Sequence, residues 1–143
     1  MPRPGVTVEV DYALSRARYL DQQAMAGPYI PGAIEKMASL GLSYDQQARW
    51  SAGLRLRYFG PRPLLEDNSV RSSSSTLVNL RLAYRIDPKT RLALDVLNLF
   101  DRQASDIDYY YASQLSREAA PVNDLHSHPA EPRTLRLSLR LSF

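Results

Sequence analysis

The side chains best suited to metal chemistry lie near the C-terminus, where Asp124, His126 and His128 occupy alternate positions. In an extended segment the two histidines would point to the same side, and two imidazoles with one carboxylate are a common ligand set for a divalent metal ion. A metal-dependent enzyme that uses His126 and His128 is therefore one hypothesis. The segment runs into Pro129-Ala130-Glu131-Pro132, a composition typical of a solvated turn. We favour the solvated loop and predict neither a metal site nor a cofactor.

An acidic and aromatic cluster precedes the histidines, and we expect it to lie in a surface loop. Tyrosine combines an apolar ring with a polar hydroxyl, so it suits both a ligand-binding surface and the boundary between lipid and water. Anchoring at the lipid headgroups is the interpretation that we favour, and capture of a ligand at the cell surface is the alternative. The cluster comprises Asp106, Asp108, Tyr109, Tyr110 and Tyr111.

The adjacent carboxylates of Glu66 and Asp67 could in principle act as a general acid and base. They lie in a segment rich in proline and serine, and nothing in the sequence predicts a shielded pocket around them. The chain also lacks a glycine-rich phosphate loop, a Gly-x-Ser-x-Gly elbow and a His-Glu-x-x-His motif. We therefore predict that the protein is not an enzyme.

The clearest pattern in the chain runs from Arg133 to Phe143, where apolar residues occupy every odd position and polar residues every even one. Successive side chains of a strand point to opposite faces, so this pattern predicts a strand with one apolar and one polar face. Tilted as in a membrane barrel, the strand would rise about 28 Å, close to the thickness of the hydrocarbon core of a bilayer.

The same alternation predicts five earlier strands, at residues 6–15, 38–44, 50–58, 78–86 and 92–96. We expect a bulge or a change of face over Leu97–Phe100, where the alternation breaks. Connections are alternately long and short, as in outer-membrane barrels, with loops at 16–32, 60–75 and 101–132 and turns at 45–48 and 87–90. The predicted fold is all-β, an antiparallel up-and-down meander of about six strands.

The two faces of the predicted sheet differ in kind. Aromatic residues of the apolar face fall near strand ends, as in the girdles of membrane barrels: Tyr44, Trp50, Tyr84 and Phe143 at one rim, Tyr12 and Tyr58 at the other. The polar face carries six arginines that we predict to face a lumen: Arg55, Arg57, Arg81, Arg85, Arg136 and Arg140. Such a basic surface favours acidic partners and anionic ligands. The alternative is that the arginines only keep the lumen-facing surface polar and solvated.

Six strands are too few to close a membrane barrel, because such barrels begin at eight strands. An open edge in lipid would leave a row of unpaired backbone groups. We therefore predict a sector of a larger transmembrane β-barrel whose remaining strands are supplied elsewhere. The alternative is a soluble all-β ligand-binding domain, which predicts short loops at both ends and a mixed second face.

Composition narrows the class further. A chain of 143 residues forms one domain or part of one, and without cysteine it has no disulfide framework. No apolar run is long enough for a transmembrane helix. The net charge of +3 comes from arginines spread singly along the chain, so we predict no nucleic-acid partner. The N-terminus lacks the apolar region of a secretion signal. If the protein lies in the outer membrane, we therefore expect the N-terminal part of the full protein to be missing from this chain.

Several stretches in this order resemble one family. They are IPGA at 30–33, GPRPLLEDNSVRSSS at 60–74, LVNLRLAYRI at 77–86, LDVLNLFD at 94–101, DIDYYYAS at 106–113 and HPAEPRTLRLSLRLSF at 128–143. With them, the chain resembles the C-terminal part of a TonB-dependent outer-membrane receptor.

The resemblance implies a location in the outer membrane and uptake of a ferric siderophore or a similar chelated nutrient. The family's barrel has 22 strands around a plug, so residues 1–143 would supply the last strands without the plug. The implied partners are membrane lipid, the remaining strands and plug, the inner-membrane TonB complex and the barrel-assembly machinery. The terminal alternation resembles the signal that this machinery reads, with Phe143 as its last residue.

Overall fold

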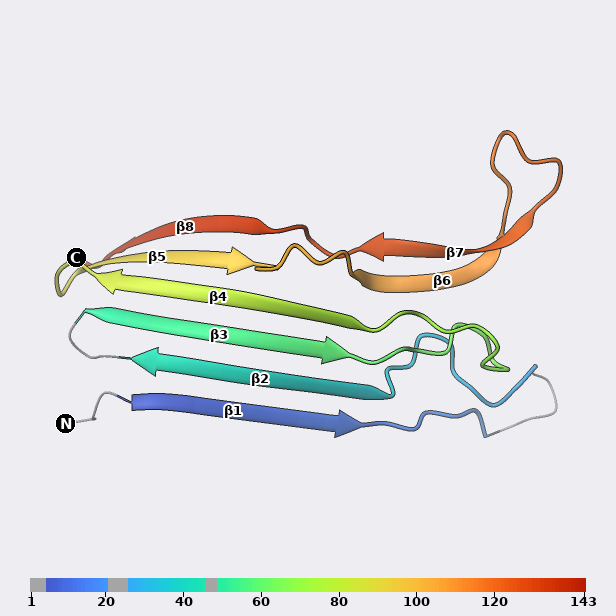
Figure 1. Cartoon of the computed structure of the whole chain (residues 1–143), viewed down its shortest axis with the longest axis horizontal. Helices are drawn as coiled ribbons and strands as arrows, with labels where there is room; N and C mark the ends of the chain where they lie inside the picture. Colours follow the sequence, from blue (N-terminus) through green and yellow to red (C-terminus); the bar gives the residue numbers. More distant parts are fainter. Residues whose placement is uncertain (1–4, 21–25, 46–48) are drawn as a thin grey trace.

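The computed structural model describes residues 5–20, 26–45 and 49–143, in which eight strands form two antiparallel sheets (Figure 1). Six strands form the main sheet in the order β1-β2-β3-β4-β5-β8: Gly5–Leu14, Lys36–Asp45, Trp50–Phe59, Ser75–Arg85, Thr90–Leu97 and Thr134–Leu141. The second sheet pairs β6 (Ser105–Ser113) with β7 (Val122–Pro129). None of the described residues belongs to a helix that could cross a membrane.

The main sheet confirms the predicted antiparallel meander. Each of its five strand pairs is antiparallel, and the strands lie within a few residues of the predicted ranges. The turn after β4 is closed by a backbone hydrogen bond from Ile86 to Thr90 and by the Asp87 carboxylate, which accepts the Lys89 N–H at 2.8 Å. Of the turn predicted at 45–48, residues 46–48 lie outside the described residues, as does the start of the chain at 1–4.

The register keeps like side chains on one face across all six strands. One row runs through Val8, Leu42, Leu54, Leu80, Val96 and Leu135, each the direct partner of the next. We call this side of the main sheet the apolar face and the opposite side the polar face. A slip of one residue in any pair would move a whole set of leucines to the polar face, so the alternation fixes the register.

The prediction of a single loop over residues 101–132 is wrong, because this stretch contains the β6–β7 hairpin. In Figure 1 the hairpin extends beyond the end of β5 and returns to the start of β8. Its tyrosine-rich first strand has high strand propensity, but Asp106 and Asp108 alternate with Ile107 and Tyr109 in a pattern that also suits an exposed loop.

The break predicted at Leu97–Phe100 is a strand end and turn rather than a bulge. Asn98 and Asp101 have positive φ angles of 48° and 51°, which these residue types tolerate better than most. The buried Asn98 side chain donates to the carbonyls of Arg102 (2.9 Å) and Glu131 (3.1 Å). The backbone N–H of Asn98 donates to Asn79 Oδ1 at 3.0 Å. These bonds hold the outgoing and returning chains together where the hairpin begins.

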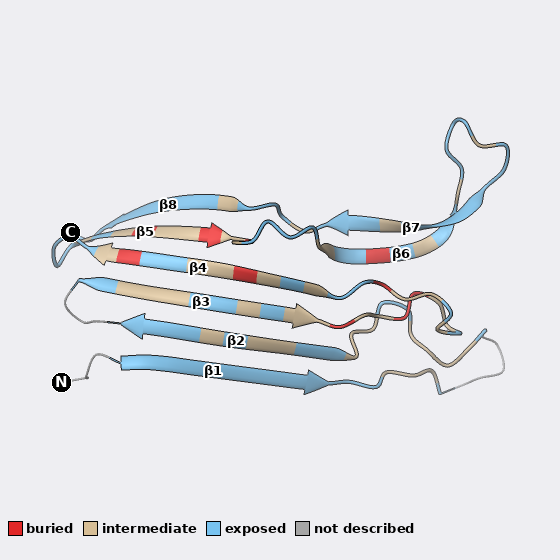
Figure 2. Ribbon diagram, in the orientation of Figure 1, coloured by how far each residue is buried: buried red, intermediate tan, exposed pale blue. Residues whose placement is uncertain are grey.

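Buried residues are few and scattered, as Figure 2 shows for β4, β5 and the connections between strands. The main sheet is a single layer, so many leucines of its apolar face remain exposed, with Leu135 and Leu137 each at 69%, although Val78 and Val96 on the same face are buried. Pro63 and Leu64, in contrast, are almost fully buried in the β3–β4 connection. The described core therefore lies partly in the long loops rather than on one side of the sheet.

Candidate functional site

The six arginines predicted for the lumen all lie on the polar face. Arg55 is the direct partner of Gly41 and Asn79, and Arg81 is the partner of Gly53 and Asp95. Arg57, Arg85, Arg136 and Arg140 lie at positions of the same parity on their strands. The alternation alone is sufficient to place them on one side of the sheet.

Carboxylates neutralise part of this basic surface. Arg55 lies 3.7 Å from Glu9, and Arg81 lies 3.5 Å from Asp95, which is also the direct partner of Arg136. Both arginine side chains are well exposed, so each pair is worth at most about 1 kcal/mol of stability. Their main effect is to reduce the local charge in the middle of the polar face.

Strand β5 adds a seventh arginine to this face, Arg91, which was not among the predicted residues. The register makes Arg91 the direct partner of both Arg85 and Arg140, so three arginines form one row across β4, β5 and β8. We call Arg85, Arg91 and Arg140 the arginine row. Arg91 stands at the start of β5 beside a turn, and only the strand register reveals that it faces the other two.

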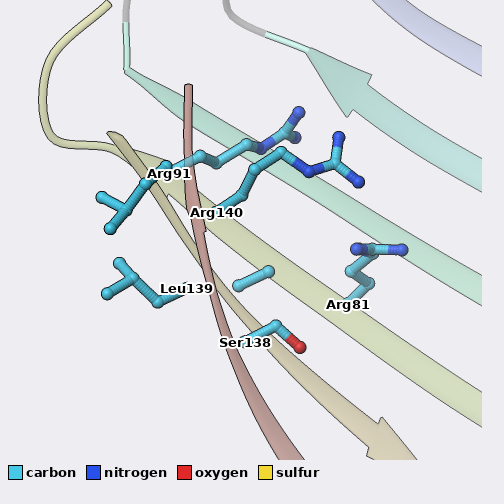
Figure 3. A pocket seen from close by; sticks show the side chains of 7 residues that line it. Arg81, Arg91, Ser138, Leu139 and Arg140 are labelled. Carbon is cyan, nitrogen blue, oxygen red and sulfur yellow. The ribbon is translucent and has the colours of Figure 1, made fainter. Parts of the chain in front are cut away.

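A hollow of about 840 Å³ lies at the arginine row, near the turn that joins β4 to β5. Figure 3 shows the side chains of Arg81, Arg91 and Arg140 projecting to the same side of the ribbon as the Ser138 hydroxyl, while Leu139 points away. Arg91 Nη2 donates to Ser51 Oγ at 2.6 Å, which extends its guanidinium group across the polar face toward β3. The hollow is lined by Arg81, Arg91, Ala93, Ser138, Leu139, Arg140 and Leu141.

The acidic and aromatic cluster lies in strand β6 instead of a loop, and Asp108 is not free to capture a ligand. The Asp108 side chain is only 4% exposed, lies 3.4 Å from Arg62 Nη2, and accepts the Ser127 hydroxyl at 2.6 Å. Arg62 also donates to the carbonyl of Asp106. This corrects the predicted surface-loop position. Tyr109 and Tyr111 remain about half exposed, and the tyrosines keep their predicted roles as hypotheses.

The residues considered for a metal site lie on β7. His126 stacks on Tyr111, with ring centroids 3.9 Å apart and planes at 17°, and its Nε2 atom is buried without a hydrogen-bond partner among the described residues. The Asp124 carboxylate accepts its neighbour's backbone N–H from Leu125 at 2.7 Å. Within the described part of the chain, no three histidine, aspartate or glutamate side chains gather as a metal ligand set, and His128 joins none.

The two long connections β1–β2 and β3–β4 pack together in what we call the loop assembly (residues 15–20, 26–35 and 60–74). Glu35 lies at its centre, 3.1 Å from Arg18 and 2.6 Å from Arg71. The hydrogen bond from Arg71, and then that from Arg18, lowers the pKa of Glu35 below its ordinary value. Arg18 in turn lies over the ring of Tyr29, 3.8 Å from its centroid.

The neighbouring carboxylates of Glu66 and Asp67 build this loop assembly and do not form an acid–base pair. Glu66 accepts the N–H of Ala26 at 3.1 Å, which joins the two connections. Asp67 accepts both the N–H and the hydroxyl of Ser69, and the backbone bond lowers the pKa of Asp67. Loop packing of this kind leaves no periodic signal in a sequence.

Four of the aromatic residues predicted for the two rims lie in two matching rows of the apolar face, while Tyr44 lies opposite Val6 and Ala52 instead. Trp50 and Tyr84 are direct partners whose ring centroids are 4.5 Å apart, and Tyr12 and Tyr58 both face Ala38. Phe143 follows the end of β8 and is fully exposed. The girdle role of these aromatic residues and the role of Phe143 in barrel assembly both remain predictions.

A comparison with solved structures finds a similar fold in the closed form of Fiu, the ferric-catecholate import receptor of E. coli K12. The match has a TM-score of 0.70 at 23% sequence identity and covers 96% of this chain. It covers only 19% of Fiu, so the chain spans about a fifth of that receptor's length. No curated protein matches the chain.

A comparison with protein families finds a match over residues 5–99 to the family described as "TonB dependent receptor-like, beta-barrel". The matched residues contain β1 to β5, and thus most of the main sheet. Together with the Fiu-like fold, this confirms the resemblance and favours the barrel sector over the soluble domain. The chain belongs to the TonB-dependent receptor β-barrel family.

Proposed function

We propose that this chain forms part of the wall of an outer-membrane receptor that imports a ferric siderophore or a similar chelated nutrient. The observation that carries the proposal is the apolar face, which exposes large apolar side chains on five of the six strands of the main sheet: β1, β2, β3, β4 and β8. Soluble proteins rarely leave so large and continuous an apolar surface in contact with water. Membrane lipid is the partner that would cover it, with aromatic girdles at its rims.

The ends of the sheet support the same proposal. β1 and β8 are its outermost strands, so each has one edge that pairs with no described strand. In a bilayer such edges must be paired, because unsatisfied backbone groups each cost several kcal/mol in hydrocarbon. We propose that further barrel strands pair with them, and that the barrel-assembly machinery inserts the chain through its terminal alternation and Phe143.

The polar face would then line the bore. Its arginines, whose charge is partly neutralised by Glu9 and Asp95, give the lumen a positively charged, solvated surface. Such a surface is complementary to an acidic plug surface and to anionic cargo. The energy for import would come from the inner-membrane TonB complex, as in the family. Asp106 and the exposed tyrosines of the hairpin are the candidates for contact with the ligand outside.

Growth and uptake under iron limitation test this function. We expect a strain that lacks the gene to lose uptake of at least one radiolabelled ferric chelate from a panel of catecholates, hydroxamates and carboxylates, and to regain it on complementation. The protein should fractionate with the outer membrane and require detergent for extraction. Unchanged uptake across the panel, or a protein that is monodisperse in buffer without detergent, would refute the proposal.

A variant of the polar face tests its part in transport. Replacing Arg55 and Arg57 together with serine removes two positive charges near the middle of the wall. We expect slower uptake of the anionic chelates, with the outer-membrane level of the protein unchanged. Full uptake at an equal protein level would show that these two arginines only keep the wall hydrated.

A further inference from the structure

The arginine row is an unusual arrangement for neighbouring strands. Directly opposed residues of antiparallel strands have Cβ atoms about 5 Å apart, and like charges at such positions destabilise the pair. Arg91 faces Arg85 on one side and Arg140 on the other, so the repulsion occurs twice in succession. A sheet would avoid this arrangement unless something else compensated the charge.

No carboxylate among the described residues supplies that compensation at Arg91 and Arg140. Neither forms an ion pair with any described residue, and Arg91 has only the neutral Ser51 hydroxyl as its partner. Arg81, at the margin of the hollow, is already paired with Asp95. Near the middle of the polar face Arg55 and Arg81 each have a carboxylate partner, whereas Arg91 and Arg140, near the β4–β5 turn, have none among the described residues.

The shape of the row limits what can occupy it. Strands are spaced about 4.8 Å apart, so the three arginines span about 10 Å across the sheet. Guanidinium groups bind carboxylate and phosphate oxygens in forked, bidentate geometry. The side chains lie on the polar face, opposite the leucines that contact lipid in the proposed function, so the row favours a ligand that arrives through water rather than a bilayer headgroup.

We propose that the arginine row is a binding site for a small, water-borne oxyanion that carries two or more negative charges. Arg91 and Arg140 bind it within the hollow, and the Ser138 hydroxyl beside them donates a further hydrogen bond to it. The site lies at the short-turn end of the sheet, away from the loop assembly and the hairpin. If the proposed function holds, anionic cargo meets this site last on its way through the bore.

Calorimetric titration of the protein in a neutral detergent tests the site without any transport. The probes are citrate and inorganic pyrophosphate, with chloride at matched ionic strength as the reference. The test variant is Arg91→Gln with Arg140→Gln, and the control variant is Arg55→Gln with Arg57→Gln, which removes the same charge from the same face. We expect the Kd of at least one probe to rise about tenfold or more in the test variant and less than about twofold in the control.

A melting experiment guards against a folding defect in the test variant. Because the substitutions remove facing like charges, we expect the test variant to be at least as stable as the wild type without ligand. The bound probe should raise the melting temperature of the wild type only. Equal loss of binding in both variants, or no binding of either probe to the wild type, would overturn the proposal. The absence of binding to the wild type would also result if an acidic segment of the protein already lay on the row. Failure of this site would leave the uptake of iron chelates unchanged, so it can be distinguished from failure of the proposed function.

Discussion

The main sheet and the loop assembly differ in where their apolar side chains lie. In the sheet, Val10 is 72% and Leu137 69% exposed, whereas in the loop assembly Leu64 is 5% exposed and Pro63 less than 2%. The loop assembly also has buried polar contacts, with Ser72 at 4% exposure. The sheet therefore needs an apolar medium around it, while the loops carry a small core of their own. Variants that act on one region and spare the other test this contrast.

The largest effect is expected where the hairpin is joined to the loop assembly. Replacing Asp108 with alanine leaves Arg62, whose side chain is 13% exposed, without its carboxylate and breaks the bond from Ser127. Removing one partner of a buried ion pair costs about 3 kcal/mol or more. We expect hydrogen exchange to accelerate in β6 and β7 but not in β2 and β3. Equal acceleration in both places would show that the two regions unfold as one.

The second largest effect is expected on the apolar face. Leu42 and Ser43 are adjacent in β2 and point to opposite faces. An arginine on the lipid side of a membrane strand costs about 2–4 kcal/mol near the midplane. We therefore expect Leu42→Arg to lower the free energy of unfolding from lipid vesicles by that amount, and Ser43→Arg to change it by less than about 0.5 kcal/mol. Similar costs for both variants would contradict a lipid-facing side.

A smaller effect is expected from tight packing between the two connections. A Cβ atom on Gly27 would lie 2.2 Å from the backbone oxygen of Glu66, which cannot move away as a flexible side chain could. Gly27→Ala should cost about 1–3 kcal/mol, the usual range for overpacking. The matched control is Gly53→Ala, because a Cβ atom there meets nothing within 4 Å. Urea unfolding that ranks the control as the more damaging change would show that the connections do not pack closely.

The smallest effect depends on pH and concerns Glu35. Its pKa is lowered in the folded protein by Arg71 and Arg18, so the unfolded chain binds the proton more tightly. The stabilisation is thus present above the ordinary pKa of 4.5 and is lost as the pH falls through the lower, folded value. At pH 7 we expect Glu35→Gln to cost about 1 kcal/mol, and at low pH the difference from wild type should vanish. The control is Glu131→Gln, which removes a carboxylate that forms no ion pair with a described residue and should therefore cost less at pH 7 than Glu35→Gln.

The sequence predicts the main sheet well because its signal is local. Alternation along one strand, such as Leu135 to Leu141, suffices to assign both faces and the place of Arg136 and Arg140. The β6–β7 hairpin was missed because its alternating aspartates also suit a loop. The arginine row and the Glu35 cluster depend on contacts between residues that are distant in the sequence, across strands and between connections. Such contacts leave no periodic pattern in a single sequence.

The pairing of β5 with β8 has a consequence for how fast the sheet can form. β4 and β5 are joined by a tight turn, but β8 reaches its place only after the whole stretch between Leu97 and Thr134. Closing a longer loop costs more chain entropy, and pairings between distant parts of a sequence slow folding. We infer that β8 is the last strand of the sheet to dock, and that the Asn98 turn and the hairpin shorten its search by bringing residues 130–133 back to the end of β5.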